Sequence, residues 1–471
     1  MKLTTINRHA FFLLIFLLSM VKSIKTTIDP DFYWYIEDGK YFVEQGKVPR
    51  ANIYSFLNNK ELISYSLGFD IILYKFYKAY GIKHLYILTG FFLTILFSLM
   101  IILSYRPQLK LIEFLIIYLG SFLLVFWGTT LRPHLISYIF TLIFFLLYEK
   151  KKLHITMLLF PIWSLFHGGV IWGSFLLGVF AIDHFLNKNT SEGINTLFYL
   201  IGGALLILIV NPYKFSYFTH LFTTLSSHTH FLSKYISEWQ SLPYALIHTR
   251  HPYYLVSFTI ICIFCILFFT GKKDKRFRDT FLMVFSAIEA VLHVRNIPLF
   301  GLVSLWILPR YIDLQPLKIR ISFESLNTRF HLFILTFANV FLLFLLINTQ
   351  KLADPLFDFY PGGAVEYLKI HKAHGRILVP SDRAAFVEYH LYPECKIAVD
   401  GRLSASKEEL LAFFKFWNME TDPIEYIIKH KINYIIIPQV SKPLIDTLLS
   451  YQNIKVVYHD RYFKLLKVEY Y

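Results

Sequence analysis

The stretch HLYILTGFFLTILFSLMIILSY, His84–Tyr105, decides the fold class of this chain. It contains no Asp, Glu, Lys or Arg, and about 20 apolar residues in a helix are enough to cross a hydrocarbon core of about 30 Å. The whole sequence has the same character, because 55% of its 471 residues are hydrophobic, only 17% are charged, and the mean hydropathy is +0.49. These values exclude a string of soluble domains and predict a polytopic α-helical membrane protein.

Further apolar runs predict about eleven transmembrane helices. The first, Ala10–Ile24, follows a basic N-terminus and has no small-residue cleavage site after it, so we expect an uncleaved signal anchor. The other expected spans are His84–Tyr105, Leu111–Trp127, Leu135–Tyr148, Leu153–Phe166, Gly168–Phe185, Thr196–Val210, Tyr253–Thr270, Thr280–Leu292, Ile297–Leu308 and Phe330–Ile347. Leu67–Tyr80 is expected to be an interfacial helix, because as a span it would expose Lys75 and Lys78 to lipid.

The distribution of charge predicts the orientation. The chain has 47 Lys/Arg and 32 Asp/Glu, a net charge of +15, but residues 353–471 hold 15 of each, so the basic excess belongs to the apolar part. That pattern is typical of cationic loops on an anionic membrane leaflet, and it argues against a nucleic-acid partner. Short basic loops such as Lys150–Lys152 and Lys272–Arg278 are predicted to lie inside, which places the first long loop and the tail outside.

The tail changes to short alternating elements. Strands are expected at Arg376–Pro380, Lys396–Asp400, Tyr434–Pro438, Lys455–His459 and Phe463–Val468, and helices at Lys407–Trp417 and Ser441–Ser450. This alternation predicts a small external α/β domain. The sequence therefore divides into a transmembrane domain at 1–350, which includes the first external loop with its interfacial helices at 25–83, and an external domain at 351–471.

Two carboxylates, Asp29 and Asp31, directly follow the predicted anchor and precede a Trp/Tyr belt. At the membrane surface such a pair can face a lipid phosphate or take a proton from an acceptor hydroxyl; the alternative is a solvated turn before an ordinary interfacial belt. Glu37 and Asp38 are expected to be solvated, on a short helix that ends at Gly39.

Basic side chains at predicted outer helix ends are candidates for phosphate binding. Arg132 and Arg295 lie at such ends, where a guanidinium binds phosphate through paired hydrogen bonds or else extends to the interface. His167, at a predicted helix break, could bind a phosphate or be a core histidine whose hydrogen bonds are satisfied within the protein. Glu238 and Trp239 belong to a long outer loop that offers a polar cleft with an aromatic platform for a sugar ring. No phosphate-binding glycine loop, zinc-ligand spacing or nucleophile elbow appears in the sequence.

Several short segments together resemble one bacterial group of GT-C-type membrane glycosyltransferases. They are Asp29–Ile36, Gly39–Tyr41, Gly46–Arg50, Tyr54–Phe56, Leu131–His134, Asn211–Tyr213, Ser237–Gln240, Arg295–Phe300 and Val399–Arg402. The resemblance implies a polyprenyl-phosphate-linked sugar donor, transfer on the outer face of the inner (plasma) membrane to a lipid, glycan or protein acceptor, and an acidic residue of the first external loop as catalytic base. That residue is Asp31, with Asp29 as the alternative. The tail lacks a Trp-Trp-Asp signature, which argues against transfer of a whole oligosaccharide to asparagine.

Some assignments stay open at this stage. Asp400 and Arg402 flank Gly401 where a strand enters a loop, and they suit either acceptor binding or an internal ion pair. A divalent metal, Mg or Mn, bridging Asp29 or Asp31 to the phosphate is not defined by two carboxylates alone, and no other cofactor is expected. The rival functions are a transporter or flippase of lipid-linked substrates and a non-catalytic envelope assembly protein.

Overall fold

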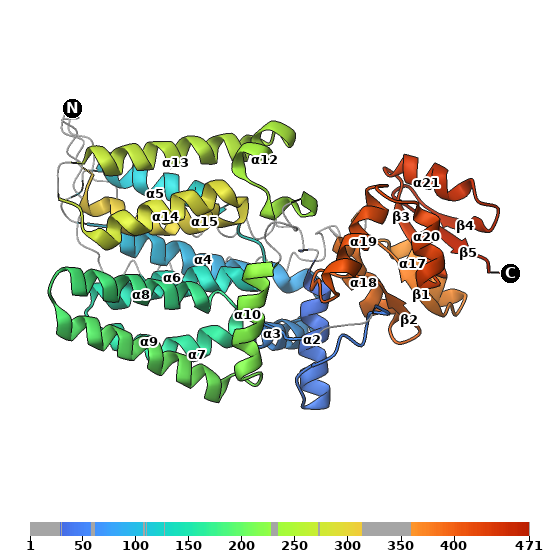
Figure 1. Cartoon of the computed structure of the whole chain (residues 1–471), viewed down its shortest axis with the longest axis horizontal. Helices are drawn as coiled ribbons and strands as arrows, with labels where there is room; N and C mark the ends of the chain where they lie inside the picture. The colour runs from blue at the N-terminus through green and yellow to red at the C-terminus, as the bar shows by residue number, and fades with distance from the viewer. Residues whose placement is uncertain are drawn as a thin grey trace. The chain divides into compact units, whose positions relative to one another are not determined.

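A computed structural model describes residues 29, 31–57, 62–106, 109, 111–126, 128–227, 234–271, 274–312 and 359–470 (Figure 1). The chain divides into two compact units. One is helical and comes from His84–Lys351, and the other combines Thr27–Lys83 with Leu352–Tyr471. The predicted anchor Ala10–Ile24 and the predicted span Phe330–Ile347 lie outside the described residues.

The helical unit consists of apolar helices joined by short turns. Its helices are α4 (Leu85–Ser104), α5 (Leu111–Phe126), α6 (Pro133–Glu149), η2 (Leu153–Ile155), α7 (Thr156–Phe166), α8 (Val170–Leu186), α9 (Thr190–Val210), α10 (Phe215–Ser227), η3 (Ser237–Trp239), α12 (Leu242–His248), α13 (Pro252–Thr270), α14 (Phe277–Leu292), η4 (Val294–Asn296), α15 (Ile297–Ile307) and η5 (Leu308–Arg310). Each predicted span that falls on described residues overlaps one of these helices, although Leu153–Phe166 includes η2 as well as α7, and α9 begins six residues before the predicted Thr196. Three helices, α4, α9 and α13, are long and apolar enough to cross a membrane by themselves. The predicted number of eleven spans rests on the sequence, since α5–α8 are shorter.

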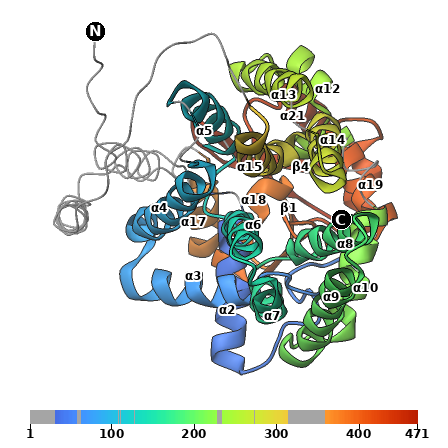
Figure 2. The same cartoon turned by 90° about the vertical axis from the view of Figure 1, so that its left-hand side faces the viewer.

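Helix α15 lies between α4, α5, α13 and α14, as the end-on view of the bundle shows (Figure 2). It contacts α4, α5, α6, α13 and α14, and its residues from Ile297 to Ile307 are almost all buried. Gly301 allows the close approach to α5, because a Cβ there would lie 3.0 Å from the Cβ of Leu124. By contrast, α9 and α13 expose large apolar side chains such as Ile209 and Leu255, which suits a lipid-facing surface.

The second unit contains a five-stranded mixed sheet in the order β2-β1-β3-β5-β4. Its elements are α2 (Phe32–Gln45), α3 (Leu67–Tyr80), η1 (Ile82–His84), α17 (Gly362–Ile370), β1 (Gly375–Leu378), α18 (Ser381–Leu391), β2 (Cys395–Ile397), α19 (Lys407–Trp417), α20 (Pro423–His430), β3 (Tyr434–Pro438), α21 (Lys442–Leu449), β4 (Ile454–His459) and β5 (Phe463–Val468). Strand β1 pairs in parallel with β2 and β3, while β5 pairs antiparallel with β3 and β4. All predicted tail elements are present, and α17, α18 and α20 are additional. Helix α18 connects β1 to β2, because neighbouring parallel strands need a crossover connection.

The first loop belongs to the same unit as the tail, whereas the sequence predicts the loop at 25–83 to be part of the transmembrane domain at 1–350 and the tail at 351–471 to be a separate domain. The Phe56 amide donates to the Ile397 carbonyl at 3.0 Å, and the Ile397 amide donates to the Tyr54 carbonyl at 3.2 Å. The Ser55 hydroxyl also donates to the Ala398 carbonyl at 2.6 Å. Residues 54–56 thus pair with the outer edge of β2. A pairing this short carries no alternating pattern that the sequence would reveal.

Candidate functional site

The two carboxylates after the predicted anchor occupy different environments at the start of α2. Asp29 is buried, and its Oδ1 accepts the Asp31 amide proton at 2.9 Å. The Asp29 carbonyl accepts from the Tyr360 hydroxyl at 3.1 Å, so this residue also joins the loop to the tail. Asp31, the N-cap residue of α2, is only partly buried. Of the two predicted bases, Asp31 is therefore the one placed closer to solvent.

Helix α2 does not end at Gly39 as expected but continues to Gln45. Gly39 is instead the point where α2 crosses α3. A Cβ at Gly39 would overlap the Asp70 carbonyl oxygen and lie 3.0 Å from the Cβ of Tyr74. The glycine is required by helix packing, and Glu37 and Asp38, just before the crossing, lie on the buried part of α2.

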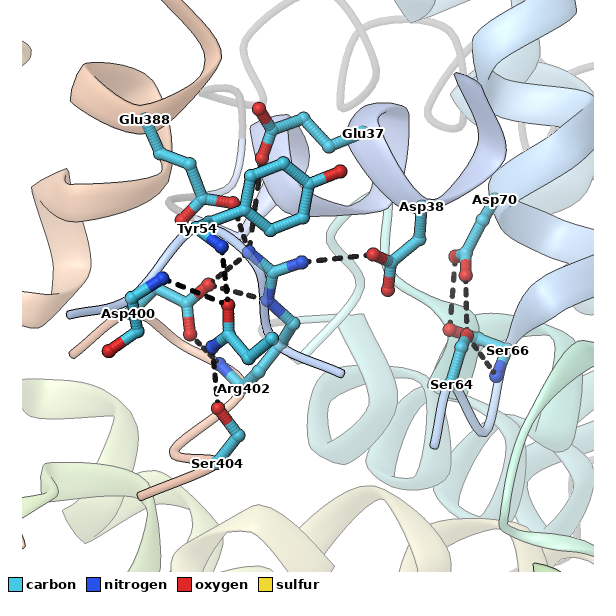
Figure 3. A network of polar contacts seen from close by, with 12 residues as sticks. Glu37, Asp38, Tyr54, Ser64, Ser66, Asp70, Glu388, Asp400, Arg402 and Ser404 are labelled. Atoms are coloured by element: carbon cyan, nitrogen blue, oxygen red, sulfur yellow. Dashed lines mark hydrogen bonds and ion pairs between the residues drawn. The ribbon is translucent and has the colours of Figure 1, made fainter. Parts of the chain in front are cut away.

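Glu37 and Asp38 are buried, and the expectation that they are solvated is wrong. Their exposed fractions are 6% and 0%, and both face the guanidinium of Arg402 (Figure 3). Arg402 Nη1 donates to Asp38 Oδ1 at 2.9 Å, and Glu37 Oε2 lies 3.8 Å from Nη2. The partner lies 364 positions along the chain from Asp38, so no local pattern could reveal it.

Two further carboxylates complete this cluster around Arg402. Asp400 Oδ2 accepts from Arg402 Nε at 2.5 Å, and Glu388 also binds the guanidinium. Asp400 is 1% exposed and the Arg402 side chain 4%. The structure therefore favours the internal ion pair over acceptor binding for these two residues.

One guanidinium cannot balance four buried carboxylates, and the pKa values show this. Burial raises the pKa of Glu37 to about 7 and that of Asp38 to about 6, although Arg402 opposes both shifts. Burial raises the pKa of Glu388 well above its ordinary value for the same reason. The cluster is consequently most favourable when some of its carboxyl groups are protonated.

A separate buried carboxyl group holds the start of α3. Asp70 accepts hydrogen bonds from the hydroxyls of Ser64 and Ser66, at 2.7 and 3.0 Å (Figure 3). Burial, together with the charge of Asp38, raises the Asp70 pKa well above its ordinary value. This residue fixes the loop that precedes α3.

In the helical unit, four predicted site residues from three separate segments meet. Arg132 Nη1 donates to Glu238 Oε2 at 3.1 Å, and the guanidinium of Arg295 lies 4.3 Å from the ring centroid of Trp239. The Val294 amide holds the two loops together by donating to the Gln240 carbonyl at 3.0 Å. Partial burial raises the pKa of Glu238, but Arg295 and Arg132 outweigh it and hold the pKa below its ordinary value.

His167 lies between α7 and α8 in a defined hydrogen-bond network. Its Nδ1 accepts the Gly169 amide proton at 3.1 Å and lies 2.7 Å from Ser137 Oγ, which itself accepts from the Trp163 indole at 2.7 Å. These contacts assign the tautomer that carries its proton on Nε2. His167 is also within electrostatic range of Arg295. The side chain therefore belongs to the same polar end, and its ring orientation is fixed.

A second polar cluster, which no local sequence pattern predicts, lies at the other ends of α6, α8 and α14. Arg278 pairs with Asp279 at 3.0 Å, and Glu149 accepts from Arg106 and Arg310 at 2.7 and 2.6 Å. With Asp183, which lies 3.9 Å from Arg278, three carboxylates balance three guanidinium groups, and all six side chains are buried or partly buried, as in a structural ion-pair network. The candidate site is the end with Arg132 and Arg295.

A scan against protein-family models finds no match for this chain, and a search of curated proteins finds no significant match either. Within the described ranges, no group of three or more His, Cys, Asp or Glu side chains has the arrangement of a metal site.

Proposed function

We propose that this chain is a multi-pass membrane glycosyltransferase of the GT-C type. It would transfer a sugar, with inversion, from a polyprenyl-phosphate-linked donor to a lipid, glycan or protein acceptor on the outer face of a bacterial plasma membrane. The observation that carries the proposal is the meeting of Arg132, Glu238, Trp239 and Arg295 at one end of the apolar bundle. Two guanidinium groups suit a phosphate whose charge grows as the donor bond breaks.

The proposed general base is Asp31. Its support is its place at the start of α2, partly exposed, while Asp29 is buried and bonded to the Asp31 amide. His167, with its proton on Nε2, is the proposed third donor to the phosphate. The reaction needs no covalent intermediate, because the acceptor oxygen attacks the sugar directly as Asp31 takes its proton.

The position of charge in the helices argues against a transporter. Transporters place charged residues near the membrane midplane. In the described helices α4–α15, every Asp, Glu, Lys and Arg lies within four residues of a helix end. This distribution suits chemistry at a membrane surface.

The test is a transfer assay with the purified full-length protein in lipid, using a panel of radiolabelled polyprenyl-phosphate sugars. Asp31→Asn removes the base but keeps the size, so turnover should fall about 10²- to 10⁴-fold while donor binding persists. Asp446→Asn, an exposed carboxylate on α21, is the matched control and should retain the wild-type rate. The proposal would be refuted if the wild-type protein showed no sugar transfer and no donor hydrolysis with every donor in the panel.

A further inference from the structure

The tail meets the first-loop helix through a glycine. A Cβ at Gly401 would lie 3.0 Å from Nε1 of Trp34 and 3.1 Å from Cγ of Asp31, and it would overlap the Asp31 Oδ1. The φ angle of Gly401 is not positive, so the backbone itself would accept any residue. The absence of a side chain at this position therefore serves the contact with Asp31 and Trp34.

Arg402, the residue after Gly401, contacts α2 about two turns beyond Asp31. Arg402 binds Asp38 at 2.9 Å, and residues 31, 34 and 38 lie on one face of α2 because they are three and four positions apart. The turn at 400–402 thus contacts α2 at both ends of that face. Two contacts separated along one helix fix its rotation and its axial position together.

We infer that Gly401 is a positioning residue for the Asp31 carboxylate, with Arg402 holding the helix that carries it. This inference rests on the proposed role of Asp31 as general base. The tail would then act on the reaction by setting the place of a carboxylate that the first loop supplies.

The kinetic test is Gly401→Ala in the full-length protein. The added methyl must displace the Asp31 carboxylate, so kcat should fall at least 10-fold while the KM for the donor stays within twofold. Gly362→Ala is the matched control, since a Cβ at Gly362 meets nothing within 4 Å, and it should keep the wild-type kcat. In an Asp31→Asn background, Gly401→Ala should cause no further loss, whereas a general structural defect would lower the residual rate again.

A second measurement tests the contact without any activity. A cysteine Sγ takes the place of an aspartate Cγ, and in a disulfide each Sγ lies about 3 Å from the partner Cβ, close to the 3.1 Å between Asp31 Cγ and a Cβ at Gly401. With the three native cysteines replaced by alanine, the Asp31→Cys/Gly401→Cys protein should form a disulfide detectable by peptide mass spectrometry. Asp31→Cys/Gly362→Cys should form none.

The outcomes distinguish a failure of the positioning role of Gly401 from a failure of the proposed function. If the disulfide does not form, or if folded Gly401→Ala transfers sugar at the wild-type rate, the positioning role is wrong. If the disulfide forms but the wild-type protein transfers no sugar, the proposed function is wrong, and the role of Asp31 as a positioned base is overturned with it.

Discussion

Arg402 is a single cation among four carboxylates, and this imbalance makes the unit sensitive to pH. Burial raises the folded-state pKa of Glu37 from 4.5 to about 7. Between these two pH values the folded chain binds a proton at Glu37 that the unfolded chain has released. The contribution of Glu37 to stability is therefore complete below about pH 4.5 and is lost as pH rises through about 7.

Glu37→Gln should remove this dependence, because glutamine mimics the protonated carboxyl group. We expect the variant to be more stable than the wild type at pH 8, by about 1 to 3 kcal/mol, and equally stable near pH 4.5. Thermal unfolding of the detergent-solubilised full-length protein at both pH values would measure the difference. Asp38, Glu388, Asp400 and Arg402, the groups that face Glu37, are present in both proteins, so the comparison changes only the side chain at position 37. Glu425→Gln, at an exposed site on α20, should show no such difference, and a Glu37→Gln protein less stable than the wild type at pH 8 would contradict the assignment.

Arg295 allows a test of phosphate binding at the candidate site of the helical unit. Arg295→Ala removes a charge-assisted contact that would exist in the ground state and strengthen in the transition state, so KM for the donor should rise about 10- to 100-fold and kcat should fall as well. Arg276→Ala, an exposed arginine at the opposite end of α14, is the control and should leave KM unchanged. An unchanged KM in the Arg295→Ala protein would exclude this residue from donor binding.

At the scale of elements, the crossing of α2 and α3 depends on Gly39. Glycine to alanine inside a helix normally stabilises by about 0.5 to 1 kcal/mol, but here the methyl would overlap the Asp70 carbonyl oxygen, which is backbone and cannot rotate away. Gly39→Ala should therefore lower stability by about 1 to 3 kcal/mol. Thermal unfolding checks this against Gly362→Ala, which should be neutral. Wild-type stability of Gly39→Ala would mean that the helices do not approach so closely.

The same elements show what the sequence was able to predict. Apolar runs and short strands depend on local patterns, so the expected bounds of α3, α19, β3 and β5 agree with the structure. Gly39 was misread because a glycine can end a helix or allow another helix to approach, and only the neighbour distinguishes the two. The Arg402 cluster and the Arg132–Glu238 pair join residues 364 and 106 positions apart. Charged residues with distant partners look like solvated ones in a single sequence.

At the scale of the whole molecule, the second unit constrains the membrane topology. It combines Thr27–Lys83 with Leu352–Tyr471, joined by backbone pairing at β2 and by the buried contacts of Arg402. In the proposed membrane protein, both segments would then lie on one side of the membrane, and the chain between them would cross it an even number of times. Ten of the eleven predicted spans fall between the two segments, which satisfies this condition.

Cysteine labelling in intact cells tests the topology. In a background without the native cysteines, Lys47→Cys in the first loop and Asp446→Cys in the tail are both exposed positions, and both should react with a membrane-impermeant thiol reagent. Asp274→Cys, exposed in the basic segment between α13 and α14, should react only after permeabilisation, because short loops rich in Lys and Arg resist translocation. If the loop and tail positions react from opposite sides, they cannot form one folded unit. If both react only after permeabilisation, the unit is intact but faces inward, and Asp31 would not meet an acceptor on the outer face.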